Sequence, residues 1–157
     1  MKKLMSLLVM TFVFTLAFLP TKSSAAPAPP LELVKIQAIG DNPNNLTTVN
    51  DTHMTLPFTT NNKMYIKVFF RGQPGPRPIL SLGSGFKYYE DAYYESQRMK
   101  VYDRWDFGGG IGRIVIYEFD AEQFQRGHNT YHEVIFTATD SRSFMIEKFD
   151  RIYVWLE

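Results

Sequence analysis

Cysteine is absent from this chain of 157 residues. Its absence excludes disulfide bonds, zinc sites built from thiolates, cysteine nucleophiles and a lipid anchor attached to cysteine. Small exported domains of eukaryotes commonly rely on disulfides. If the chain is exported, the lack of cysteine favours a bacterial, Gram-positive source.

Long apolar runs are also missing after residue 19. The one such run, residues 4–19, follows two lysines and is succeeded by a proline and a group of small residues. This order is typical of a secretory signal peptide, and the run is short for a membrane-spanning helix. We predict that residues 1–25 are a signal peptide cleaved after Ala25, that the protein is secreted, and that the processed chain is not inserted in a membrane.

A surplus of positive charge is missing as well. The chain has 17 lysine and arginine residues against 16 aspartate and glutamate residues. Cleavage after Ala25 would remove three lysines, leaving 14 basic residues and a formal net charge of −2. This balance gives no electrostatic reason to expect nucleic acid as a partner.

The processed chain would hold about 130 residues, which is enough for one domain and too few for two. It would start with the proline-rich residues 26–30. Proline fixes the backbone and donates no hydrogen bond, so we predict an extended leader there. Residues 31–157 are predicted to form a single domain.

The stretch that best indicates the fold is residues 131–140. Val134, Phe136 and Ala138 fall on one face of an extended chain and polar residues on the other, the period of a half-buried strand. Alternation or short apolar runs between turns predict further strands at residues 31–39, 54–58, 64–71, 79–82, 86–94, 99–105 and 113–119, and a last strand ending near residue 157.

Helix is possible at only two places, residues 89–99 and residues 121–126, and the second is short enough to be one turn. Because strands dominate and turns recur about every ten residues, we predict an all-β protein with an antiparallel β-sandwich and one or two short helical turns.

The run Phe-Asp-Ala-Glu-Gln-Phe at residues 119–124, followed by Gly127, Tyr131 and Asp140, resembles the closing half of immunoglobulin-like and fibronectin-type domains. The resemblance implies an immunoglobulin-like sandwich with Tyr131 as a tyrosine corner before the penultimate strand. Tyr131 lies three residues from Val134, so it is out of phase with the apolar face unless a bulge intervenes.

A second resemblance rests on the N-terminal region. The signal peptide followed by Ala-Pro-Ala-Pro-Pro-Leu at residues 26–31 is similar to the small exported YolA-like proteins of Bacillus, a group without an established activity. This resemblance implies secretion more than a mechanism.

The histidines do not indicate a metal site. His128 and His132 stand four apart, which would bring them together on a helix, but here they straddle a turn and the start of a strand. His53 is isolated. We therefore expect surface histidines and no metal or cofactor.

Two glycine-rich segments suggest catalytic motifs only superficially. Residues 108–112 would need a helix after them to hold phosphate, and a strand follows instead, so a hairpin or bulge is expected. Residues 81–85 lack the spacing of a nucleophile elbow.

Close carboxylates occur at Glu90 with Asp91 and at Asp103 with Asp106. Such pairs could serve a small secreted hydrolase or bind calcium. Arg104 lies between Asp103 and Asp106, which favours local ion pairing instead.

Aromatic residues are unusually dense between residues 86 and 107. Neighbouring residues of a strand point to opposite faces, so these rings cannot all enter one core and some should face solvent. The alternative is that tyrosines pair across strands on a half-exposed face with no ligand at all. The eight aromatic residues of this segment are Phe86, Tyr88, Tyr89, Tyr93, Tyr94, Tyr102, Trp105 and Phe107.

The function predicted from these features is a secreted, non-enzymatic binding module. Its partner would be cell-wall glycan, an extracellular polysaccharide or another secreted protein, and a small carboxylate-dependent hydrolase is the alternative. The predicted contact residues are Tyr88, Tyr93, Tyr94, Tyr102 and Trp105, with Tyr153 and Trp155 as a second patch.

Overall fold

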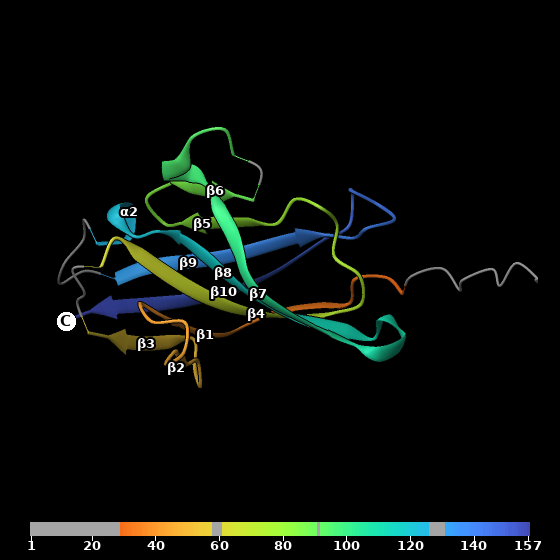
Figure 1. Cartoon of the computed structure of the whole chain (residues 1–157), viewed down its shortest axis with the longest axis horizontal. Coiled ribbons are helices and arrows are strands. Elements are labelled where there is room, and N and C mark those ends of the chain that lie inside the picture. Colours follow the sequence, from red (N-terminus) through yellow and green to blue (C-terminus); the bar gives the residue numbers. More distant parts are fainter. Residues whose placement is uncertain (1–28, 58–60, 91, 126–130) are drawn as a thin grey trace, which may run out of the picture.

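Ten strands make up most of the structure, a computed structural model that describes residues 29–57, 61–90, 92–125 and 131–157 (Figure 1). The first sheet contains β1 (Leu33–Gly40), β2 (Thr47–Thr48), β4 (Lys63–Arg71), β7 (Met99–Phe107) and β8 (Gly112–Asp120). The second contains β3 (His53–Leu56), β5 (Ile79–Leu82), β6 (Lys87–Tyr89), β9 (Tyr131–Thr139) and β10 (Glu147–Leu156). The predicted signal peptide lies outside the described residues.

The strand order confirms the immunoglobulin-like sandwich. The first sheet runs β2-β1-β4-β8-β7 and the second β3-β10-β9-β5-β6. If β1, β4, β5, β7, β8, β9 and β10 are taken as strands A, B, C, D, E, F and G, the sheets have the A-B-E-D and C-F-G orders of that fold. All pairs are antiparallel except β3 with β10, which is parallel.

The core lies between the two sheets and follows from the alternation in each strand. On β4, Met64, Ile66, Val68 and Phe70 point inward and are almost fully buried. Burying one such side chain contributes roughly 1.5–3 kcal/mol. The facing residues on β9 and β10 are Val134, Phe136, Ala138, Ile152, Val154 and Leu156.

Residues 89–99, one of the two places where helix was possible, contain a short helical turn and no longer helix among the described residues. In the described part of this stretch the turn is the 3-10 turn η1 (Glu95–Gln97), between the end of β6 and the start of β7. The strand predicted over residues 86–94 is likewise shorter than expected, since β6 ends at Tyr89. The short helical turn after residue 120 is confirmed as α2 (Glu122–Gln125).

The tyrosine corner is also wrong. Tyr131 is an exposed residue at the start of β9, and its ring packs against that of Trp155 at 4.8 Å between centroids. Because side chains alternate along β9, the burial of Val134 places Tyr131 on the outer face.

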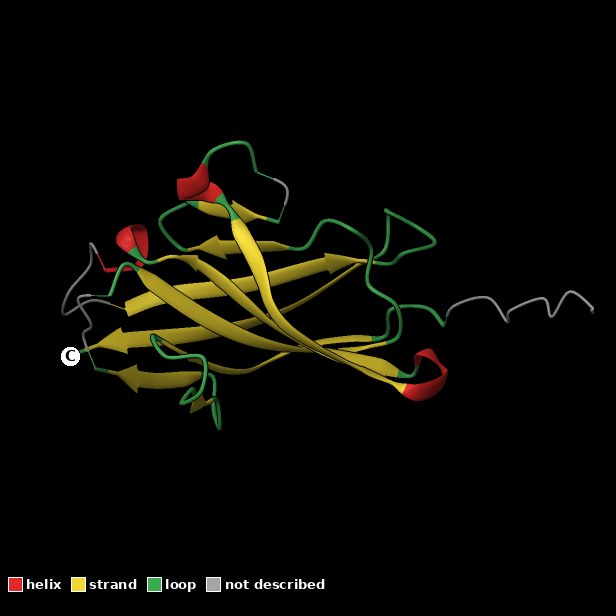
Figure 2. Ribbon diagram, in the orientation of Figure 1, coloured by secondary structure: helices red, strands yellow, loops and turns green. Residues whose placement is uncertain are grey.

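Strands β7 and β8 form a long hairpin that extends past the other strands, and Figure 2 shows a helical turn at its tip. That turn is η2 (Gly108–Gly110), in which Gly109 has a φ of 73°. Such a backbone favours glycine, so the glycine-rich segment is confirmed as a hairpin turn.

The connections that follow β4 and β9 contact the first residues of the described chain. Leu31 donates its backbone N–H to the buried carboxylate of Asp140 at 2.5 Å, and Arg142 donates its own at 2.7 Å. Gly72 has a φ of 86°, and a Cβ there would lie 1.8 Å from the carbonyl oxygen of Pro30. These contacts hold the connection between β9 and β10, and that between β4 and β5, beside the residues that precede β1.

Candidate functional site

The predicted contact residues do not form one surface. Tyr88 is 0 % exposed, so it is a core residue and cannot be a contact residue. Its hydroxyl donates to the backbone oxygen of Asp120 at 2.7 Å, and burial raises the pKa of the phenol. The remaining candidates divide among the outer face of the first sheet, the link between β6 and β7, and the outer face of the second sheet.

The outer face of the first sheet carries a row of rings along β7, which we call the ring row and define as Tyr102, Trp105 and Phe107. Their exposed fractions are 49 %, 45 % and 45 %. Each ring packs against a residue of β4: Tyr102 against Tyr65, Trp105 under the ammonium of Lys67, and Phe107 against Phe69. The contacts between these rings and β4 thus reach over β8, which lies between β4 and β7.

A bulge in β7 brings these rings onto one face. Val101 pairs with Tyr117, but Asp103 pairs with Ile116, so Tyr102 is an extra residue on β7. Without the bulge, Tyr102 and Trp105 would point to opposite faces because they are three residues apart.

The floor and the charges of this face come from β4 and β8. Ile114 and Ile116 pair with Trp105 and Asp103, so they lie beneath the ring row. The Nζ of Lys67 is 5.9 Å from the centre of the Trp105 ring, a cation–π contact, and within the described chain Lys67 makes no ion pair with a carboxylate. The ring row therefore has a positive charge beside its middle ring.

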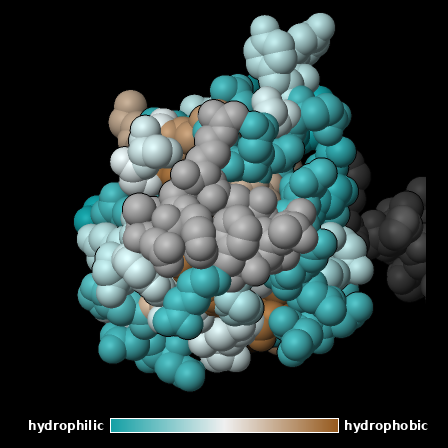
Figure 3. Space-filling view, turned by 90° about the vertical axis from the view of Figure 1, so that its left-hand side faces the viewer, coloured by the Kyte–Doolittle hydropathy of each residue, from teal (hydrophilic) through white to brown (hydrophobic). Residues whose placement is uncertain are grey.

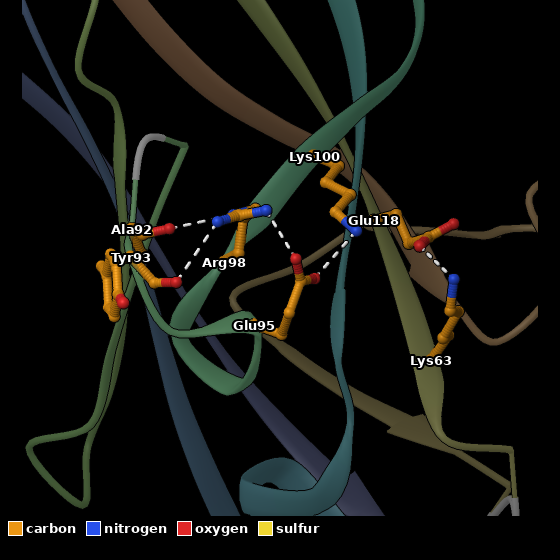
Figure 4. A network of polar contacts seen from close by, with 7 residues as sticks. All are labelled: Lys63, Ala92, Tyr93, Glu95, Arg98, Lys100 and Glu118. Carbon is orange, nitrogen blue, oxygen red and sulfur yellow. Dashed lines mark hydrogen bonds and ion pairs between the residues drawn. The ribbon is translucent and has the colours of Figure 1, made fainter.

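Tyr93 and Tyr94 lie apart from the ring row, on the link between β6 and β7. Both are exposed, and their rings contact each other edge to face at 5.3 Å. Figure 4 shows how Arg98 holds this link: its guanidinium donates to the backbone oxygens of Ala92 and Tyr93 and pairs with Glu95. Hydrogen bonding to Lys100 then lowers the pKa of the Glu95 carboxyl.

The second sheet has its own outer cluster of rings, which we call the second-sheet cluster and define as His53, Tyr131, Tyr153 and Trp155. His53 stacks on Tyr153 at 5.1 Å, and Tyr131 packs against Trp155 at 4.8 Å. The hydroxyl of Tyr153 donates to Glu133 at 3.3 Å, and Glu133 also pairs with Arg151. As the alternation of β10 predicts, Ile152, Val154 and Leu156 are buried behind it.

The described carboxylates among those predicted for a hydrolase make separate contacts. Asp103 accepts the backbone N–H of Arg104, whereas the Asp106 carboxylate is bound by the guanidiniums of Arg104 and Arg113. Glu90 lines a pocket on the inner side of β7, and Asp91 lies outside the described residues.

The other catalytic candidates take structural places. Residues 81–85 form the end of β5 and the turn to β6. His132 stacks on Phe124, and His128 is not among the described residues. Over the described ranges, no group of three or more histidine, aspartate and glutamate residues could hold a metal ion.

Several apolar residues on the outer side of the sheets and in the turns were missed by the sequence analysis. Tyr65 and Phe69 alternate with the core residues of β4, so their places on the outer face could have been predicted from the same period. Met145 is 96 % exposed beside Phe144 in the turn between β9 and β10, and Ile111 is exposed at the tip of the β7–β8 hairpin. By contrast, the C-terminal end of the sandwich is mostly hydrophilic around the grey atoms in Figure 3.

Comparison with known proteins gives no relative: no family model, no curated protein and no solved structure matches this chain. Among the described helices, none has the length and apolar character needed to cross a membrane.

Proposed function

We propose that this protein is an exported, non-enzymatic binding module whose ring row binds a wall glycan or another extracellular polysaccharide. The observation that carries the proposal is the half-exposure of Tyr102, Trp105 and Phe107 along one strand. Each ring contacts a residue of β4 and is still about half-exposed to solvent.

The geometry of the ring row suits an extended polymer. Residues two apart on a strand are separated by roughly 7 Å, so Trp105 and Phe107 offer successive flat contacts along one line. Sugar rings have apolar faces that pack on aromatic rings, and their hydroxyls need polar neighbours. Lys67 and Lys100 supply hydrogen-bond donors near the same face.

The proposed place of action rests on the N-terminal sequence. The signal peptide predicted at residues 1–25 supports secretion. In the Gram-positive source that we expect, a secreted protein passes through the cell wall. Wall glycan is therefore the first ligand to test.

The test is retention of the purified protein on insoluble peptidoglycan, with chitin and cellulose as further polymers. We expect the native protein to sediment with peptidoglycan and Trp105→Ala to weaken retention by at least about tenfold, as loss of a central aromatic contact would. The melting temperature should fall by less than about 3 °C, because Trp105 is half-exposed.

Trp155→Ala is the matched control, since it removes the other tryptophan from the opposite sheet. It should leave retention unchanged. Equal retention of native protein and Trp105→Ala would overturn the proposal. So would failure of the native protein to bind any of the three polymers, which would leave a protein partner as the occupant of this face.

A further inference from the structure

The inner side of β7 borders a pocket of about 390 Å³ that the ring row does not use. Its walls come from both sheets: β7 and β8 supply one side, and the connections after β4, β6 and β9 supply the other. Its volume is within the usual range for small-ligand sites, roughly 300–1,000 Å³. A pocket of this size can enclose a sugar or a molecule of similar size.

The bulge that sends Trp105 outward also sends its neighbours inward. Arg104 pairs with Val115 and Asp106 pairs with Arg113, on the side of β8 that faces the second sheet. Two arginines therefore line a pocket whose floor, Val115 and Tyr117, is continuous with the core.

The arginines are held in place by one carboxylate. Asp106 accepts from Arg104 at 2.8 and 3.0 Å, and Arg113 approaches the same carboxylate at 3.3 Å. Arg113 also donates to the side-chain oxygen of Gln73 at 2.6 Å, and its side chain is only 14 % exposed. The two guanidinium groups thus share the Asp106 carboxylate, the Glu90 carboxylate also lines the pocket, and each guanidinium keeps N–H groups beyond these bonds.

Burial lowers the pKa of the Arg113 guanidinium, and the nearby charge of Arg104 lowers it further. An anion bound beside both groups would offset that cost, because opposite charge favours the charged form.

The hydroxyl of Tyr117 is a second, independent feature of the pocket. Tyr117 is 4 % exposed and lines the pocket, and burial raises the pKa of its phenol, so the hydroxyl stays protonated and can donate. Its place beside the arginines provides a third donor for an anionic group.

We infer that this pocket binds a small hydroxylated carboxylic acid of the uronic-acid type. The carboxylate is held by Arg104, Arg113 and the Tyr117 hydroxyl, since planar guanidinium groups match carboxylates well. The body of the ligand packs on Val101 and Val115. Its hydroxyls face Glu90 and Ser141, which line the pocket from the connections of the second sheet. This site is independent of the ring row.

The test is titration of the purified protein with D-glucuronate, followed by amide chemical shifts in NMR spectra, with D-glucose and inorganic phosphate as separate probes. We expect glucuronate to shift the amides of pocket residues on β7 and β8, and the two other probes to bind at least about tenfold more weakly. Arg104→Gln and Tyr117→Phe should each weaken glucuronate binding, the arginine variant by about tenfold or more.

Arg104 is about half-exposed and Tyr117→Phe removes only a hydroxyl, so both variants should keep the fold, which the NMR spectrum reports directly. Trp105→Ala serves as the control from the outer side of the same strand and should bind glucuronate normally. Equal affinity for glucose, equal affinity for phosphate, or unchanged binding by both pocket variants would each overturn the inference. None of these results depends on retention by an insoluble polymer.

Discussion

The two outer faces of the sandwich carry similar numbers of rings, but they differ in how those rings are partnered. In the second-sheet cluster the rings pack on one another, and the hydroxyl of Tyr153 is bonded to Glu133, which Arg151 neutralises. In the ring row each ring packs on a β4 residue, and Lys67 has no carboxylate partner within the described chain. The outer face of the first sheet therefore has a lysine available to a ligand beside its rings, whereas the rings and charges of the second-sheet cluster contact one another.

The difference shows that aromatic content alone does not identify a binding surface. Rings that pack edge to face within one layer stabilise the fold by about 0.5–1.5 kcal/mol for each pair beyond the area they bury. The second-sheet cluster gains this energy within the folded chain. The three rings of the ring row are each about half-exposed, so a ligand can pack on their exposed parts without breaking existing contacts.

The largest effect is expected from a ring that belongs to neither face. Tyr88→Ala should lower the free energy of unfolding by about 3–5 kcal/mol, because it leaves a cavity beside Phe86 and Phe119. Tyr88→Phe should cost only about 1 kcal/mol through loss of the hydrogen bond to Asp120. Urea unfolding measures both, and equal losses in the two variants would contradict the core placement of this ring.

Asp140 offers a change that should affect both faces together. Asp140→Asn keeps only one acceptor oxygen for the backbone N–H groups of Arg142 and Leu31, so we expect the melting temperature at pH 7 to fall by roughly 5 °C. Below its melting temperature the variant should still bind ligand, because the two sheets are unchanged.

The same carboxylate makes this difference depend on pH. Hydrogen bonds from the backbone of Arg142 and of Leu31 lower the pKa of Asp140 in the folded protein. A lowered folded-state pKa contributes stability above the unfolded value, about 3.9, and that stability is lost as the pH falls through the folded pKa. Thermal unfolding of both proteins from pH 7 to pH 2 should therefore show the gap closing below about pH 4. If the difference in melting temperature between the native protein and Asp140→Asn did not change with pH, the ionised Asp140 carboxylate would not be the acceptor proposed here.

Trp155→Ala breaks the second face alone. Trp155 is partly buried against Tyr131, so its removal should lower the free energy of unfolding by about 1–2 kcal/mol. Trp105→Ala should cost less stability and more ligand affinity. Urea unfolding of the two variants side by side tests the contrast, and a larger stability loss for Trp105→Ala would reverse the roles given to the two faces.

Much of this fold follows from the sequence because the period of a strand is short and local. The alternation of residues 64–71 predicted β4 and its buried face, and residues 79–82 coincide with β5. The immunoglobulin-like sandwich is confirmed by the strand order. The same local period also predicted Tyr153 and Trp155 on the outside of β10.

The candidate site was harder to predict because it depends on one bulge and on pairing between strands. A regular strand would place Tyr102 and Trp105 on opposite faces, and nothing in the local pattern marks Tyr102 as the extra residue. The pairing of Arg104 and Arg113 around Asp106 also needs β7 and β8 in register. The alternation of residues within one strand does not predict which residues of the neighbouring strand they will contact.

Lys67 places a positive charge on the outer face of the first sheet, beside the ring row. Lys67→Glu should weaken retention on peptidoglycan, which carries carboxylates, by roughly three- to tenfold at low salt, and the difference should shrink at high salt because exposed charges are screened. Arg151→Glu on the other sheet is the matched charge reversal and should leave retention unchanged. Sedimentation at two salt concentrations measures this, and equal retention of native protein and Lys67→Glu would remove charge from the account of the ring row.

The smallest effect is expected from the polar edge of the second-sheet cluster. Glu133→Gln weakens the pair with Arg151 but leaves an oxygen to accept from Tyr153, and partly exposed ion pairs contribute only about 0–1 kcal/mol. We therefore expect the free energy of unfolding to fall by less than about 1 kcal/mol in low salt and by less still in high salt, with retention on peptidoglycan unchanged. Urea unfolding at both salt concentrations distinguishes this from a binding role. A loss of retention without a loss of stability would show that the second face also contacts the ligand, and the two faces would then act together.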